Sequence, residues 1–562
     1  MRTLSVWTLT LSLLGAIATA AAQSPELFGP RGKDRGVAAV ANGRPPLYAG
    51  LSELKMQVTT RSDAAQDYFN QGWRLIWAFN HAEARRSFRA TQYLDPECAM
   101  CFWGEALALG PNINDPMHDD AIAPAFDYSR KALSLRPGTT ELEAALIDAL
   151  TARYAKASAA DRAALDRKWA AAMGKVAEKF PRDPNVLTLY ADALMNTQPW
   201  DYWEAGGETP KGQGAKIVDL LARALSLDPD HIGAAHLYIH ALEASAHPEK
   251  AEAVADRLRG AAPGAGHLVH MPAHIYLRLG RHQDSIAVNR DAIAADEAFL
   301  ARAGDAASAI YRFGYYPHNL HFLLASAQMA GLRDDAISAA ARLGALTSER
   351  VSHDLPWVQA IQTAIYTAHA QFSDAETILA LKPPGDQLPF VRGFWHYSRG
   401  VAFASRADTE AVGQEIAAIK QLRAHEEISR LEALLFPART VLEIAERVIA
   451  LRLAQTKGEF TTAESELRRA IELQDALPYM EPPYWYYPIR QTLGAVLLQS
   501  GRANEAARIF EKTLRKSPRN AWALWGLWRA QEAVGDSRAF ETHAAFRKAW
   551  LGPETLLKLD RL

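Results

Sequence analysis

Apolar residues recur along this chain at the three- and four-residue spacing of amphipathic helices, and the alternating runs typical of strands are nearly absent. Helical stretches end on related sequences, Ala132–Pro137 and Ala224–Pro229 (Ala-Leu-Ser-Leu-x-Pro), with variants at Tyr93–Pro96 and Leu514–Pro518. A glycine followed five residues later by a small residue also recurs, at Gly280, Gly331, Gly458 and Gly501. One helix pair cannot bury its apolar face alone, so the pattern predicts an all-α array of stacked pairs.

These residue choices, at a period of about 34 residues, resemble the tetratricopeptide repeat (TPR) family. The best matches are Tyr68–Pro96, Ile232–Pro263, Gly266–Ala294, Pro317–Gly344, Leu451–Leu477 and Tyr487–Pro518. The resemblance implies a TPR-like helical-hairpin solenoid, a right-handed superhelix whose first helices line a concave groove. Arrays of this family commonly hold a protein or peptide partner in that groove. Such binding is therefore the alternative function to be tested.

The pattern divides the chain into five segments. We expect a signal peptide (1–22), an extended lead-in (23–63), an N-terminal TPR-like array (64–344), degenerate helical repeats (345–440) and C-terminal TPR-like repeats (441–562). Residues 196–215 interrupt the first array with a loop that contains Trp200 and Trp203. This loop either covers a mouth of the groove or crosses the surface.

The first residues have the form of a secretory signal. Arg2 precedes the apolar run Val6–Ile17, and the small residues Ala20–Ala22 follow. The apolar run is too short to span a membrane. We therefore expect a periplasmic or secreted protein with no membrane span.

The charge balance and the two cysteines bear on the protein's partners and on its redox compartment. Lys plus Arg (62) nearly cancels Asp plus Glu (64), which argues against a nucleic-acid partner. Cys98 and Cys101 are separated by two residues. In an oxidising compartment a disulfide is favoured, with thiolate ligands or a redox pair as alternatives.

Histidines are concentrated in the middle of the chain. Seven of the 17 fall within an 86-residue window: His236, His240, His267, His270, His274, His318 and His321. The interval from His236 to His270 equals that from His240 to His274, 34 residues, which is the repeat period. Residues three, four and seven apart share one face of a helix, so each group forms a stripe on its own helix.

The TPR resemblance implies where these stripes point. Aligned on Pro229, Pro263, Gly331 and Ala336, all seven histidines fall at repeat positions 2, 5 and 9, which face the concave groove in that family. Glu243 falls at position 12 of the same face. Neighbouring helices lie about 8–10 Å apart, so side chains from adjacent repeats can share one ion.

This arrangement predicts a transition-metal site. Imidazole suits zinc, copper and iron, and Glu243 is the natural carboxylate ligand; Glu243 with three histidines favours iron or zinc, whereas histidines alone favour copper. An anionic or peptide ligand, or no ligand, are the alternatives. Pro272, between His270 and His274, either kinks the helix or starts a new one.

Other residues are candidates for the groove wall or for ligand contacts. Two tryptophans lie early in the array, Trp73 and Trp77. Arg278, Tyr316 and Asn319 lie beside the histidine stripes, and the segment Glu481–Arg490 contains Tyr484, Trp485 and Arg490. For the aromatic segment, core packing is the alternative. The chain has no phosphate-binding loop, no dinucleotide fingerprint and no G-x-S-x-G elbow, so we expect no nucleotide cofactor and no serine-hydrolase activity. Whether the protein is an enzyme stays open.

Overall fold

The computed structural model describes residues 44–156, 161–346, 349–354 and 356–562. The predicted signal peptide, residues 1–22, lies outside this part of the chain. The contacts divide it into two compact units. We call residues 44–275 with Val288–Tyr316 the N-terminal unit, and Tyr276–Ala287 with Pro317–Leu562 the C-terminal unit.

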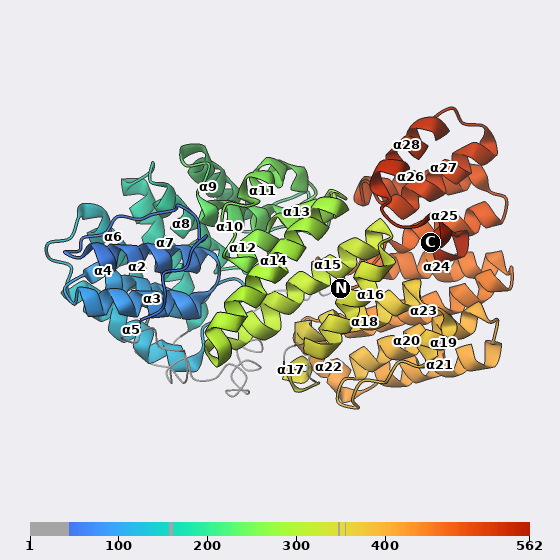
Figure 1. Ribbon diagram of the computed structural model, residues 1–562, viewed down its shortest axis with the longest axis horizontal. Helices are drawn as coiled ribbons and strands as arrows, with labels where there is room; N and C mark the ends of the chain where they lie inside the picture. Colours follow the sequence, from blue (N-terminus) through green and yellow to red (C-terminus); the bar gives the residue numbers. More distant parts are fainter. Residues whose placement is uncertain (1–43, 157–160, 347–348, 355) are drawn as a thin grey trace, which may run out of the picture. The chain divides into compact units, whose positions relative to one another are not determined.

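The described residues form helices joined mostly by short loops, and within them the only β-type pairings are isolated bridges (Figure 1). The helices up to the middle of the chain are α2 (Asp63–Trp77), α3 (His81–Leu94), α4 (Ala99–Leu109), α5 (Asp119–Ser134), α6 (Glu141–Leu150), α7 (Arg162–Lys179), α8 (Pro184–Met195), α9 (Gly214–Leu227), α10 (Ile232–Glu243), α11 (Glu252–Leu258), α12 (Gly266–His270), α13 (Pro272–Arg278) and α14 (His282–Ala303). A π-helical turn, Tyr311–Tyr315, precedes α15 (Tyr316–Ala330).

The remaining helices belong to the C-terminal unit. They are α16 (Arg333–Leu346), α17 (Glu349–Asp354), α18 (Pro356–Phe372), α19 (Ala375–Leu379), α20 (Pro389–Ser405), α21 (Thr409–Arg423), α22 (Glu426–Ala433), α23 (Ala438–Thr456), α24 (Phe460–Asp475), α25 (Ile489–Gln499), α26 (Ala503–Lys516), α27 (Ala521–Val534) and α28 (Ala539–Ala549). Consecutive helices pack in pairs, such as α2 with α3 and α26 with α27. Each unit is therefore a TPR-like stack of helical hairpins.

The recurring glycines lie at helix ends. Gly331 follows α15 with φ +79°, and Gly501 lies between α25 and α26 with φ +81°. This left-handed backbone ends a helix at little cost only when the residue lacks a Cβ atom. The ring of Trp550 also packs against Gly331, 2.2 Å from where a Cβ atom would lie.

The same packing motif holds the helix pairs together in both units. The Phe88 ring of α3 lies between Gly72 of α2 and Gly104 of α4, where added Cβ atoms would approach it to 2.7 and 2.4 Å. In the C-terminal unit, Phe510 lies in the same way between Gly494 and Gly526, with 2.7 and 2.3 Å. Each phenylalanine is sixteen residues from each of its two glycines, a regularity that we did not predict from the sequence.

The segment before α2 is extended and packs on the array. Its apolar side chains, among them Leu51 and Met56, are buried. The backbone N–H of Met56 donates to Asn70 Oδ1 (3.2 Å) and that of Val58 donates to Gln66 Oε1 (3.0 Å). No helix in the described part of the chain combines the length and apolar character needed to cross a membrane.

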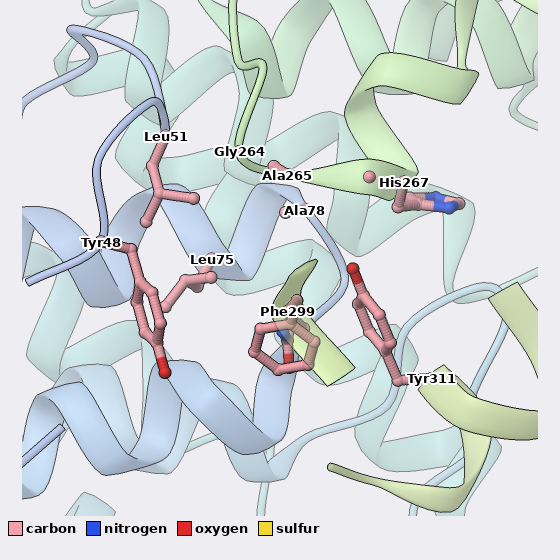
Figure 2. Close-up of a pocket in the computed structure, with 11 residues that line it drawn as sticks. Tyr48, Leu51, Leu75, Ala78, Gly264, Ala265, His267, Phe299 and Tyr311 are labelled. Atoms are coloured by element: carbon pink, nitrogen blue, oxygen red, sulfur yellow. The ribbon is translucent and has the colours of Figure 1, made fainter. Parts of the chain in front are cut away.

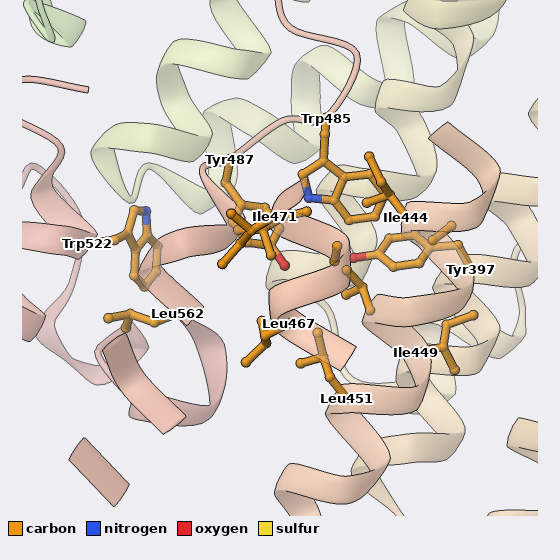
Figure 3. Close-up of a cluster of buried hydrophobic side chains, with 14 of the residues drawn as sticks. Tyr397, Ile444, Ile449, Leu451, Leu467, Ile471, Trp485, Tyr487, Trp522 and Leu562 are labelled. Carbon is orange, nitrogen blue, oxygen red and sulfur yellow. The ribbon is translucent and has the colours of Figure 1, made fainter. Parts of the chain in front are cut away.

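The aromatic segment Glu481–Arg490 belongs to the core of the C-terminal unit, which corrects the expectation of a ligand-binding wall. Trp485 and Tyr487 are buried among aliphatic side chains such as Ile444 and Ile471, and Tyr484 packs against the same core (Figure 3). The guanidinium of Arg490 pairs with the carboxylate of Asp475 at 2.5 Å. The Arg490 guanidinium, which we expected to contact an anion, therefore already has a carboxylate partner.

The Gly–Phe–Gly motif gives a test of the fold. We expect Gly526→Ala to lower the free energy of unfolding by about 1–3 kcal/mol, because the new methyl group overlaps the Phe510 ring. Gly413→Ala is the matched control: Gly413 lies in α21 with no atom within 4 Å of an added Cβ. That substitution raises stability by up to about 1 kcal/mol. Denaturant unfolding measures both, and equal effects of the two substitutions contradict the packing.

Candidate metal centre

Five of the seven predicted histidines and Glu243 come together in the N-terminal unit. Helix α10 carries His236, His240 and Glu243; α12 carries His267 and His270; α13 carries His274. All six residues are at most 3% exposed. We expected these side chains to face a concave groove, and the structure buries the imidazoles in an enclosed cluster.

The break at Pro272 resolves the alternative that the sequence left open. Helix α12 ends at His270, and α13 begins at Pro272, with Met271 between them. Proline fits the first position of a helix, where its missing N–H would have no partner in any case. His274 therefore stands on a separate short helix.

Glu243 fixes two of the imidazoles. Its Oε1 lies 2.5 Å from His240 Nδ1, and its Oε2 lies 2.6 Å from His274 Nδ1. Burial alone raises the pKa of the Glu243 carboxyl, but the neighbouring His274 and His240 outweigh it and hold that pKa below its usual range. The carboxylate thus accepts both Nδ1–H groups, which leaves each Nε2 with a lone pair when the ring is neutral.

Two further imidazoles are fixed in the same way. His236 donates from Nδ1 to the backbone carbonyl of Trp77 (2.7 Å), and His270 donates from Nδ1 to Asn289 Oδ1 of α14 (2.7 Å). Their Nε2 atoms then carry lone pairs as well. Hydrogen bonds to Nδ1 from carboxylates and carbonyls are the usual support of metal-binding histidines.

The Nε2 atoms face one another. His270 Nε2 lies 2.9 Å from His274 Nε2, and His267 Nε2 lies 3.1 Å from His236 Nε2. His240 Nε2 is buried without a hydrogen-bond partner among the described residues. Burial lowers the pKa of His240, and it lowers the pKa values of His236, His267 and His270 further. These imidazoles are therefore neutral, the form that binds metals.

Aromatic side chains enclose the cluster. The Phe79 ring lies 4.4 Å from that of His236 and 5.5 Å from that of His267, centroid to centroid. Trp200, from the loop 196–215, packs edge-on against His240 at 5.0 Å, and Tyr315 lies 4.5 Å from His267. Trp200 is itself 42% exposed, so its packing on His240 fits both roles that we considered for the loop.

Both covering residues have left-handed backbone. Phe79 has φ +52° and Trp200 has φ +64°. A bulky side chain adopts this conformation at a cost of about 1–3 kcal/mol, which the surrounding structure must offset. Trp200 Nε1 donates to the carbonyl of Ile113 (2.8 Å), and Trp203 Nε1 donates to that of Ala241 (2.7 Å), so the loop is tied to its neighbours.

A small cavity lies beside the cluster but does not contain it. It is bounded by Tyr48, Leu51, Phe299, Tyr311 and residues 264–267. Figure 2 shows the His267 imidazole directed away from Tyr48 and Leu51. The cavity therefore reaches the start of α12, while the ring nitrogens point into the histidine cluster.

The other candidates lie elsewhere. Trp73 and Trp77 are buried, with their rings 5.0 Å apart, so they are core residues and correct the expected open aromatic groove. Tyr316 donates to Glu297 Oε1 (2.8 Å). Arg278 stacks over the Tyr479 ring (5.4 Å) in the C-terminal unit.

Three predicted residues lie on α15 in the C-terminal unit. Asn319 and His321 are buried, and burial lowers the pKa of His321 to about 3. The ring of His318 packs edge-on against Phe322 at 4.9 Å. The participation of His318 and His321 in the site stays a prediction.

Cys98 and Cys101 are joined by a disulfide at the start of α4. This is one of the three states that the sequence allowed for the pair. Both residues are buried.

Comparison with known proteins gives only distant similarity. No protein-family model and no curated protein matches the chain. Solved structures with similar helices include the human IFIT1 dimer with m7Gppp-AAAA (TM-score 0.31, 11% identity, 88% of this chain and 90% of that chain). The APC/C hetero-tetramer Cut9–Hcn1 (0.27, 13%, 87% and 77%) and the P58(IPK) TPR domain (0.21, 13%, 88% and 98%) are others. At these values the similarity carries no argument about the activity of this chain.

The cap of α10 gives a pH test of this region. His231 Nδ1 accepts the N–H of Ala234 (3.0 Å), and burial lowers the pKa of His231 to about 4. The unfolded chain binds this proton near pH 6.5, so the stabilisation is complete above that value and is lost as the pH falls toward 4. The loss reaches about 3 kcal/mol at about 1.4 kcal/mol per pKa unit.

His231→Asn keeps a capping side chain that does not titrate. We expect its melting temperature to fall less than that of the wild type between pH 7 and 4.5, measured by circular dichroism. His247→Asn, at an exposed histidine, is the control and keeps the wild-type profile. Identical pH profiles for His231→Asn and the wild type show that His231 is not the titrating group.

Proposed function

We propose that this chain is an exported TPR-like protein whose N-terminal unit holds a transition-metal ion in the buried histidine cluster. One observation carries the proposal: His236, His240, His270 and His274 all donate from Nδ1 to fixed acceptors. Their Nε2 lone pairs therefore point into the buried interior. Lone pairs at this spacing repel unless a cation lies between them.

The ligand set favours copper. Both oxygens of Glu243 accept imidazole N–H groups, so the atoms that converge are histidine nitrogens. Imidazole-only sites suit copper, and zinc is the second choice. Glu243 supplies one negative charge in the interior, which offsets a monovalent ion fully and a divalent ion by half.

The enclosure argues against a peptide ligand at the histidines. The five histidine residues are at most 3% exposed, and Phe79 and Trp200 pack against them. A peptide would have to displace these aromatic side chains. A partner-binding role of the helical array is compatible with the metal site but needs another surface. Export is supported by the signal-like residues 1–22.

The direct test is metal analysis of the protein purified from the periplasm. We expect at least one equivalent of copper or zinc in the wild type, and less than a tenth of that in the His240→Ala/His274→Ala double variant. His247→Ala, at an exposed histidine, is the matched control and keeps the wild-type content. Wild-type protein that holds no metal, and takes up none of the added copper, iron or zinc, rejects the proposal.

The Glu243→Gln substitution tests the hydrogen bonds that orient the histidines rather than the histidine ligands themselves. One amide oxygen cannot accept both Nδ1–H groups, so one histidine loses its orientation. We expect metal affinity to fall about 10–100-fold, measured by competition with a chelator. Glu249→Gln is the matched control, because Glu249 contacts the Nδ1 of the exposed His247 at 3.1 Å. Unchanged affinity in Glu243→Gln contradicts the role assigned to this carboxylate.

A further inference from the structure

Resting on the proposed function, we infer that the cluster is a two-ion centre. One ion is held by His236, His240 and His267, which we call centre A. The other is held by His270 and His274, which we call centre B. The two centres share one support, the carboxylate of Glu243.

The ligand atoms fall into separate groups. Those of His236, His240 and His267 all lie within 4.8 Å of one another, and this group includes neither His270 nor His274. His274 belongs to a different group, with His240 and Glu243. The ligand atoms of the five imidazoles thus do not form one group, and the two groups share only His240.

The distances between ring nitrogens match two ions. Two nitrogens bound to one ion at about 2.1 Å are separated by about 3.0 Å at a right angle and by about 3.4 Å in a tetrahedron. His236 and His267 approach to 3.1 Å, and His270 and His274 to 2.9 Å. Each pair thus has the spacing of neighbouring ligands on an ion of its own.

His240 stands between the two pairs. Its ring centroid lies 4.8 Å from that of His236 and 5.3 Å from that of His274. His240 occurs in the ligand-atom group of His236 and His267 and also in that of His274 and Glu243, and we place it in centre A because its ring lies nearer to that of His236. Its buried Nε2 has no hydrogen-bond partner among the described residues. Centre A therefore has three histidines.

Glu243 couples the centres. Its Oε1 orients His240 of centre A and its Oε2 orients His274 of centre B. Centre A, with three imidazoles, is expected to fill first. Centre B is defined by His270 and His274, and a small anion bound there would balance the charge of the second ion in this interior.

Stoichiometry tests the inference. Metal-free protein is titrated with Cu(I) under anaerobic conditions against a chromophoric chelator. We expect two equivalents for the wild type, the second bound at least tenfold more weakly than the first. His270→Ala should retain one equivalent of the tighter class, and His267→Ala should weaken that class. His247→Ala is the control and binds two.

The outcomes separate this inference from the proposed function. One equivalent in the wild type at saturating Cu(I) overturns the two-ion centre and leaves the metal-binding proposal standing; no binding overturns both. Loss of both equivalents in a folded His270→Ala variant also overturns the separate centres. Circular dichroism checks that each variant folds, and where one does not, the wild-type stoichiometry alone decides.

Discussion

The carboxylate of Glu243 is the interaction on which this site depends. It accepts one N–H group from α10 and one from α13, so it links two successive repeats through their histidines. A buried carboxylate is costly unless charge-assisted hydrogen bonds compensate for its lost hydration. Here both oxygens have such partners, and the same two bonds turn the imidazole Nε2 atoms inward. Glu243 thus supplies a negative charge to the cluster and sets the tautomer and direction of His240 and His274.

The rest of the N-terminal unit makes the interior dry enough for that carboxylate to matter. Phe79 and Trp200 lie against the imidazoles although their backbone is left-handed. Strain of this kind persists only where surrounding contacts determine the conformation. Burial lowers the pKa values of His236, His240, His267 and His270, and a neutral imidazole can bind a cation without first losing a proton. The burial of the cluster therefore favours the neutral imidazoles that bind a metal ion.

The sequence predicted the helical array and the histidines of the site, but not the residues that support and enclose them. Repeated glycines such as Gly331 mark helix ends because their conformation is local, and the 34-residue interval of His236 and His270 reports stacking. Phe79 and Asn289 could not be found this way, since they come from outside the histidine stripes and act only through tertiary contact. Trp73 was assigned to an open groove by repeat position, but position does not tell whether neighbouring helices cover a face. Arg490 was misjudged for the same reason, because its partner Asp475 lies on another helix.

The most direct measurement is anomalous X-ray diffraction from crystals of the purified protein, collected on both sides of the copper and zinc absorption edges. The account predicts an anomalous peak about 2.1 Å from the Nε2 atoms of His236 and His240. Crystals of metal-loaded protein with no anomalous peak in contact with these nitrogens would contradict it.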